Sequence, residues 1–191
     1  HVYSVVGGGL VDEDEGAANV GKNTNITISG GAWAGDTEVS SSQPDKIAVA
    51  GGGHILSNDP SMIGTNSDIK TATTNVGGEV HITLNGITGN LVDCIVGGCY
   101  DAGKSNAEKI TGTTGPVKID IDNCRFESQF HRIFGGGYVA WGGNNRDIQV
   151  KGNVEITVDH STVQYLYGGG CGITAALPLV TGDVNITLTN S

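Results

Sequence analysis

The chain has 191 residues, of which 37% are hydrophobic, 32 are glycine and only 5% are aromatic. Its formal charge is −10, so a nucleic-acid backbone or an anionic membrane surface is an unfavourable partner. No stretch approaches the ~20 consecutive apolar residues of a membrane-spanning helix, and we expect no membrane insertion.

Many Gly, Thr, Asn, Val and Ile residues and few helix formers are typical of short strands joined by turns. One alternating pattern, V-x-I-x-(I/L/V), occurs five times, and its third and fifth positions are always aliphatic. This alternation predicts strands with one buried and one solvent-facing side. The predicted strands are residues 24–28, 80–84, 117–121, 154–158 and 184–188.

A second motif, two apolar residues followed by two or three glycines, alternates with these strands. It opens the chain at residues 5–9 and recurs at 49–53, 95–98, 133–137 and 166–170. Glycine at the same place in each repeat suits a bend where stacked backbones leave no room for Cβ atoms, or where φ is positive. The shortest repeat, residues 152–181, fits a coil of three short strands, the third of them near Leu179 and Val180.

These repeats predict an all-β fold, a right-handed parallel β-helix (β-solenoid) of about five coils with variable loops. Equivalent strands would stack about 4.8 Å apart, with their aliphatic side chains in continuous columns. A β-sandwich is the competing interpretation, but Asn-Gly and Asp-Gly hairpin turns between adjacent strands are nearly absent. We expect residues 1–191 to be a single solenoid segment excised from a larger repeat-containing protein, with flanking repeats or domains that cover the coil ends.

The stacking order places Asp120, Asp122 and Asp159 on the outward side of neighbouring coils. Asp122 and Asp159 would share one column about 5 Å apart. There they could bind calcium, the only cofactor we consider; the alternative is that both carboxylates are solvated. With His131 or Arg132 as a base, the three acids would supply the parts of a lyase site that abstracts a proton beside a uronate carboxylate. These five residues are the catalytic candidates.

Four aromatic residues lie in or beside the variable loops: Trp33, Tyr100, Tyr138 and Trp141. Flat rings at such places can stack on sugar faces, so these four are the candidate ligand-binding residues. The alternative is that they cover the ends of the apolar interior.

Two further signals predict no site. Residues 98–105 match the phosphate-loop expression GxxxxGK(S/T), but they follow a glycine corner of a β-coil and lack the required α/β domain, so we interpret the match as accidental. The four cysteines form no CxxC pair, and we expect buried free thiols.

The glycine-punctuated coils, such as residues 152–158 followed by 166–170, resemble the Gly-rich β-helical repeats of bacterial cell-surface and adhesin-like proteins. The resemblance implies an extracellular protein, secreted or at the cell surface, that contacts carbohydrate or a host surface protein; it transfers no catalytic residue. We therefore expect an adhesin-like module that presents loops for glycan or host-protein binding. A polysaccharide-acting β-helix enzyme, either a lyase or a glycoside hydrolase, and a structural stalk without ligand are the alternatives.

Overall fold

The computed structural model describes residues 4–11, 15–34, 47–55, 71–90, 94–102, 109–127, 132–140, 145–172 and 177–191. Within these ranges the chain forms 23 β-strands and no helix. All pairings between these strands are parallel, which confirms the predicted β-solenoid and rules out the sandwich. The described part of the chain contains no helix that is long and apolar enough to span a membrane.

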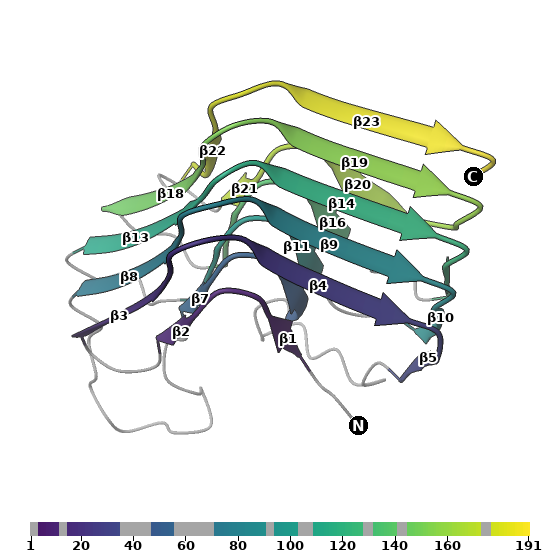
Figure 1. Ribbon diagram of the computed structural model, residues 1–191, viewed down its shortest axis with the longest axis horizontal. Helices are drawn as coiled ribbons and strands as arrows, with labels where there is room; N and C mark the ends of the chain where they lie inside the picture. Colours follow the sequence, from purple (N-terminus) through teal and green to yellow (C-terminus); the bar gives the residue numbers. More distant parts are fainter. Residues whose placement is uncertain are drawn as a thin grey trace.

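The five alternating repeats each form a strand of six residues, and together these strands make one sheet, here called the long sheet. They stack in chain order (Figure 1). Their register is the predicted one, with Ile26, Ile82, Ile119, Ile156 and Ile186 in one column. The strands are β4 (Thr24–Ser29), β9 (Val80–Asn85), β14 (Val117–Asp122), β19 (Val154–Asp159) and β23 (Val184–Thr189).

The glycine motif separates two further five-stranded sheets, the rear sheet before the glycines and the corner sheet after them. The rear sheet consists of β1 (Val5–Val6), β6 (Ile47–Ala50), β11 (Cys94–Val96), β16 (Arg132–Phe134) and β20 (Tyr165–Tyr167). The corner sheet consists of β2 (Leu10–Val11), β7 (His54–Ile55), β12 (Tyr100–Asp101), β17 (Tyr138–Val139) and β21 (Cys171–Gly172).

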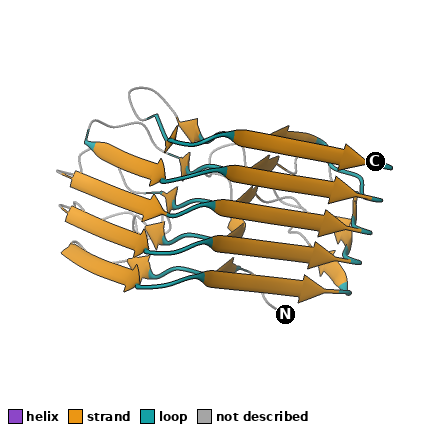
Figure 2. Ribbon diagram, turned by 45° about the horizontal axis from the view of Figure 1, so that its top comes forward, coloured by secondary structure: helices purple, strands orange, loops and turns teal. Residues whose placement is uncertain are grey.

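A fourth sheet, the side sheet, runs beside the long sheet and immediately precedes it in each coil (Figure 2). It consists of β3 (Glu15–Val20), β8 (Thr71–Val76), β13 (Lys109–Thr114), β18 (Arg146–Val150) and β22 (Leu179–Val180). A short sheet contains β5 (Ala32–Ala34), β10 (Thr88–Asn90) and β15 (Arg125–Phe126).

Among the described residues, the first three coils have five strands each and the last two have four. Residues 152–181, for which three strands were expected, contain four: β19, β20, β21 and β22. The side sheet escaped the sequence pattern because its buried positions hold small or polar residues. In β8, for example, the buried residues are Ala72, Thr74 and Val76. Only the strand near Leu179 and Val180 was expected, and it is present as β22.

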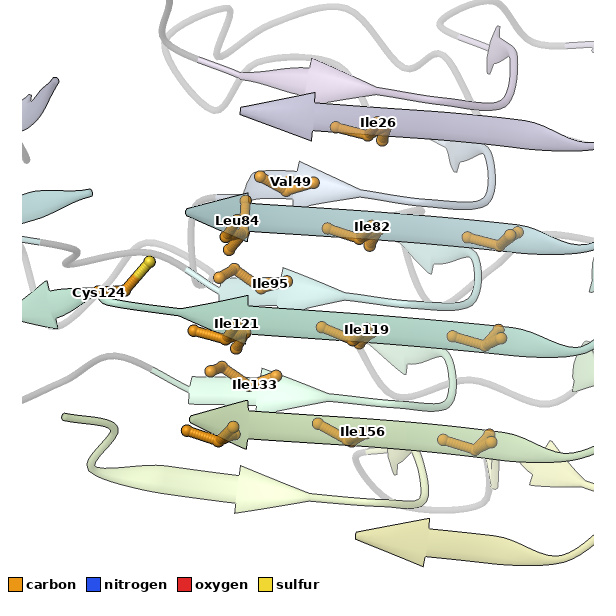
Figure 3. Packing of buried hydrophobic residues seen from close by; sticks show 14 of the residues in the cluster. Ile26, Val49, Ile82, Leu84, Ile95, Ile119, Ile121, Cys124, Ile133 and Ile156 are labelled. Carbon is orange, nitrogen blue, oxygen red and sulfur yellow. The ribbon is translucent and has the colours of Figure 1, made fainter. Parts of the chain in front are cut away.

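The main core lies between the long sheet and the rear sheet. Ile82, Ile119 and Ile156 form a column that is at most 1% exposed, and Ile95 and Ile133 of the rear sheet pack against it (Figure 3). Burial of each such side chain stabilises the fold by roughly 1.5–3 kcal/mol relative to exposure. The predicted aliphatic columns are thus the principal core of the protein.

A smaller core lies between the corner sheet and the side sheet. Ile55 and Val139 of the corner sheet pack there with Ile110 and Ile148 of the side sheet, and all four are buried. This second core fixes the angle at which the side sheet leaves the glycine corner.

The glycine corner is explained by close approach of neighbouring coils. A Cβ atom on Gly52 would lie 2.7 Å from the backbone of Gly98, and one on Gly136 would lie 2.6 Å from the nitrogen of Gly170. None of these glycines has a positive φ angle, so packing rather than conformation requires them.

Positive φ angles occur instead at the residue that follows each strand of the long sheet. The five equivalent residues have φ between 45° and 68°. They are Gly30, Gly86, Asn123, His160 and Asn190. Glycine and asparagine tolerate this left-handed conformation, whereas His160 adopts it at a cost in free energy.

We expect His160→Asn to raise the free energy of unfolding by about 0.5–1 kcal/mol, because asparagine populates the left-handed region more readily. The mostly exposed contact between His160 Nδ1 and Asp159, at 3.1 Å, contributes little that would be lost. Urea unfolding of the two proteins measures the difference. Asn123→His at the equivalent place in the preceding coil should lower stability by a similar amount, and equal stabilities for all three proteins would contradict this explanation.

Candidate functional site

The outward side of the long sheet brings two of the predicted acidic residues together. Asp122 and Asp159 are direct partners in the ladder. Their carboxylates and the ring of His160 each offer one atom, and these atoms lie within 4.8 Å of one another. The sequence pattern placed the two acids next to each other, as observed. It did not include His160, which follows Asp159 directly and has a positive φ angle.

Side-chain hydrogen bonds already orient this acidic cluster. Asn123 Nδ2 donates to Asp122 Oδ2 at 3.0 Å, and Asn190 Nδ2 donates to Asp159 Oδ1 at 3.2 Å. Carboxylate oxygens suit calcium, whereas the imidazole of His160 suits a transition metal. Calcium takes roughly six to eight oxygen ligands, so the two carboxylates would supply only part of its coordination shell.

Asp120 lies in the neighbouring outward column and is held by two basic side chains. His81 Nε2 of the preceding coil lies 2.7 Å from Asp120 Oδ2, and Lys118 Nζ lies 3.2 Å from the same oxygen. Asp120 therefore forms an ion pair with Lys118 and a hydrogen bond with His81 on the sheet surface, and it does not belong to the cluster of Asp122, Asp159 and His160.

The structure separates Arg132 from the acidic residues. Ile133 faces the main core from the rear sheet, so the side chain of Arg132 points to the opposite side of that sheet. Asp120 lies between core-facing Ile119 and Ile121 and points away from the same core on the long-sheet side. Arg132 and the three acids thus lie on opposite sides of the core, which corrects the expectation that they could share one substrate. His131 lies outside the described residues.

Tyr100 and Tyr138, two of the candidate ligand-binding residues, are buried. Their rings stack with centroids 5.4 Å apart, His54 meets Tyr100 edge-on at 4.9 Å, and Phe134 packs against Tyr138 at 5.1 Å. The two tyrosines therefore form an aromatic ladder on the outer side of the corner sheet and expose no ring face to a sugar. They belong to a cluster of their own, so they do not cover the ends of the main apolar core as the packing alternative had it. Repetition of tyrosine at one place after the glycines was the signal for this ladder.

The two tryptophans remain open as ligand-binding candidates. Trp33 belongs to β5 by its backbone, and Trp141 lies outside the described residues, in the connection between β17 and β18. Residues 103–105 of the accidental phosphate-loop match also lie outside them.

Sequence reasoning missed a buried ion pair between the corner and side sheets. Arg146 Nη1 lies 3.1 Å from Asp101 Oδ2, and the two side chains are 1% and 0% exposed. Burial lowers the pKa of Arg146, and the charge of Asp101 opposes this shift. The sequence contained a signal for this buried charge. Tyr100 and Tyr138 are equivalent residues of neighbouring coils, and the residue after them is Asp101 in one coil but the apolar Val139 in the next.

All four cysteines are free, and Cys94, Cys99 and Cys124 are buried, as expected. Burial raises the pKa of the Cys99 and Cys124 thiols. Both therefore stay protonated at neutral pH and are poor nucleophiles.

Among the described residues, His54 is a largely buried histidine whose titration should affect stability. Burial lowers the pKa of His54 to about 4 from 6.5, and within the described ranges its Nε2 atom has no hydrogen-bond partner. The unfolded chain therefore takes up a proton near pH 6.5, whereas the folded chain takes it up only near pH 4. The contribution of the neutral His54 ring to the free energy of unfolding is therefore fully present above pH 6.5, and it is lost as the pH falls toward 4.

We expect this histidine to reduce the free energy of unfolding by about 2–3 kcal/mol between pH 7 and pH 4. His54→Phe keeps a ring against Tyr100 but removes the titrating group. Urea unfolding of both proteins across this range should show a steeper loss in the wild type. Identical pH profiles would mean that the folded protein accommodates the charged imidazole.

The connections from the corner sheet to the side sheet start and end on strands that are stacked in the same order in every coil. The strands before them stack on one another, and so do the strands after them, so their anchor points form two parallel columns. The connections differ greatly in length: residues 12–14 form the shortest and residues 56–70 the longest. Trp141 belongs to the connection of the fourth coil.

Comparisons with models of known protein families, with curated proteins and with solved structures found no match for this chain. No residue role is therefore carried over from another protein.

Proposed function

We propose that the chain is an adhesin-like solenoid module of an extracellular surface protein, and that it presents inserted segments to a carbohydrate or a host surface protein. The supporting observation is the edge between the corner and side sheets, where connections of different length start from regularly stacked anchor points. A rigid stack of this kind holds variable binding segments at fixed spacing.

The chemistry of the side sheet also suits a neutral polar partner. Its outward residues include Thr73, Asn75, Thr111, Thr113 and Gln149, whose hydroxyl and amide groups can bond to sugar hydroxyls. Thr113 Oγ1 donates to Asn75 Oδ1 of the preceding coil at 2.6 Å, which orders these groups across coils. The net charge of −10 disfavours polyanionic partners.

A polysaccharide lyase has less support, because Arg132 lies on the other side of the core from the acidic residues. Proton abstraction needs a base within hydrogen-bond reach of the substrate carbon that the acids bind. A stalk without ligand is the remaining alternative, and binding experiments distinguish it.

The test is a glycan array and a panel of host surface proteins, each probed with the chain in calcium and in chelator. We expect a specific carbohydrate or protein to bind, and we expect Trp141→Ala to weaken that binding at least tenfold, because stacking aromatics contribute strongly. Tyr165→Ala is the matched control, since Tyr165 is an exposed aromatic of the rear sheet away from this edge. Absence of any ligand under both conditions would contradict the proposal and favour the stalk.

The calcium arm also tests the acidic cluster. Binding that requires calcium and is lost in Asp159→Asn, but kept in Glu155→Gln on the same strand, would assign Asp122 and Asp159 to the site. If the ligand binds equally well in calcium and in chelator, the acidic cluster is not needed for binding and the inserted segments are the binding elements.

A further inference from the structure

Neighbouring coils of the solenoid offer one another nearly identical apolar surfaces. In the long sheet, the valines that open β9, β14, β19 and β23 share one column, and the isoleucines two residues later share the next. The glycine bend repeats as well, because a Cβ on Gly52 or on Gly98 would meet the backbone of the following coil in the same way. These contacts therefore do not determine which coil stacks on which.

One buried contact departs from this repetition. The corner-sheet column of Asp101 holds only apolar residues or glycine in the other coils: Val11, Ile55, Val139 and Gly172. The side-sheet column of Arg146 likewise holds apolar residues or glycine in the coils before it: Gly16, Ala72 and Ile110. Among the described strands, Asp101 and Arg146 are thus the only polar members of their columns.

The two charged residues meet across successive coils. Asp101 ends β12 in the third coil (β11 to β15), and Arg146 begins β18 in the fourth coil (β16 to β19). Arg146 Nη1 lies 3.1 Å from Asp101 Oδ2 and 3.4 Å from Asp101 Oδ1, and both side chains are almost fully buried. The contact therefore exists only when the fourth coil stacks directly on the third.

A different stacking of these coils would bury a charge without its partner. If β18 paired with β8 in place of β13, Arg146 would lie opposite Ala72, and Ile55 would stand in the place of Asp101. If the first or second coil of another copy took the place of the fourth coil, Asp101 would meet Gly16 or Ala72. An isolated charge in an apolar interior is costly, so each such arrangement is disfavoured by about a hundredfold or more.

The pair also fixes the register of β18 on β13. Because side chains alternate, a shift by one residue would turn the apolar residues of β18 outward. A shift by two residues keeps the alternation and can place Ile148 opposite Ile110, so the apolar pattern of the side sheet alone does not exclude it. Such a shift moves Arg146 by about 6.6 Å along the strand and separates it from Asp101.

Charged contacts on the outer surface do not make the same distinction. His81 and Asp120 join the second and third coils, but their side chains are 31% and 29% exposed. Asp122 and Asp159 join the third and fourth coils, but they carry like charges. Water solvates a partly exposed charge whether or not its partner is present, so these contacts contribute little to the choice of stacking.

We propose that Asp101 and Arg146 specify the stacking order of the coils, and that this specificity is the reason for a buried ion pair in the small core. The two charges admit the fourth coil onto the third and reject the other coils and the coils of a second copy. Apolar residues would hold the two coils together as well, but they would also accept a wrong coil. Removal of both charges together should therefore leave the native state stable and make its assembly less selective.

Refolding from urea tests this proposal, with Asp101→Val combined with Arg146→Ile as the apolar pair. Size-exclusion chromatography with light scattering should show that the wild-type chain returns to a single monomeric species. For the apolar pair, we expect wrongly stacked monomers and coil-exchanged dimers to increase by about tenfold or more. Hydrogen-exchange mass spectrometry detects the wrongly stacked monomers as a second population of peptides from β13 and β18. The purified native monomer should unfold at nearly the urea concentration of the wild type.

Three further variants separate the choice of stacking from packing. Asp101→Leu combined with Arg146→Met is a second apolar pair with larger side chains, and it should misassemble like the first. Asp101→Arg combined with Arg146→Asp reverses the pair but keeps opposite charges in the two columns, so it should refold to one species. Asp147→Ala removes an exposed acid next to Arg146 on the same strand and is the matched control, which should refold like the wild type.

Three outcomes would overturn the proposal. If both apolar pairs refold to a single monomer as completely and as fast as the wild type, apolar packing alone selects the stacking. If neither apolar pair reaches a folded monomer, the charges are needed for stability itself. Misassembly of the reversed pair to the same extent as the apolar pairs would show that opposite charges do not direct the stacking. The measurements involve no ligand, so they do not depend on the proposed binding function.

Discussion

Replacing Asp101 with alanine is expected to lower the free energy of unfolding by about 3–5 kcal/mol. The Asp101 carboxylate is fully buried and lies 3.1 Å from the guanidinium of Arg146. Without this carboxylate, the arginine keeps its positive charge in the small core but loses the negative charge that offsets its desolvation. Arg146→Ala should lower the free energy of unfolding by a similar amount, because it leaves the buried carboxylate of Asp101 without the positive charge of the guanidinium.

Replacing both partners should restore most of the lost stability. Asp101 shares its column with Ile55 and Val139, and Arg146 shares its column with Ile110, so Asp101→Val combined with Arg146→Ile continues two apolar columns. Urea unfolding should place the double variant within about 1 kcal/mol of the wild type, because well-packed apolar residues can replace a buried ion pair. A loss below 1 kcal/mol for Asp101→Ala would show that the pair is not held in a dry core.

Gly136→Val is expected to cost about 4 kcal/mol or more, because its new side chain would meet backbone rather than flexible atoms. A Cβ at this position would lie 2.6 Å from the nitrogen of Gly170 and 2.8 Å from the carbonyl carbon of Gly169. Accommodation would require two coils to separate, which would disrupt the rear-sheet and corner-sheet pairings on both sides of the bend.

Gly169→Val is the matched control, because it makes the same substitution one coil further along the same column. Its Cβ would meet nothing within 4 Å, so at low protein concentration its unfolding free energy should stay within about 0.5 kcal/mol of the wild type. Thermal or urea unfolding of the two variants measures the contrast. Equal losses would mean that glycine is required for its backbone freedom and not for the approach of the next coil.

The parts of the fold that the sequence predicted are those with strict alternation. The columns through Ile82, Ile119 and Ile156 were predictable because a one-residue slip would turn every aliphatic side chain toward solvent. The side sheet was not predictable, because buried positions such as Thr74 and Gly112 resemble loop residues in sequence. These residues are buried because the neighbouring sheets approach closely at their positions, and that distance is set only when the whole coil is assembled.

The candidate site was predictable only within one sheet. Equivalent residues of stacked strands are neighbours in the sheet, so the repeat alone placed Asp122 beside Asp159. It gave no information on where the rear sheet lies, so Arg132 could not be placed on the correct side of the core. Long-range contacts between different sheets, such as that of Asp101 with Arg146, likewise depend on the bend at the glycines.

Among the described strands, pairing joins only consecutive coils, and this has a mechanical consequence. Tension applied to the two termini would load the interfaces in series, and the weakest interface would open first. Ile121 and Val158 are equivalent positions of adjacent coils and lie 37 residues apart, so release of one such coil would lengthen a tether by roughly 120 Å. A chain of this design would yield to pulling in steps, one coil at a time, while the remaining coils keep their shape.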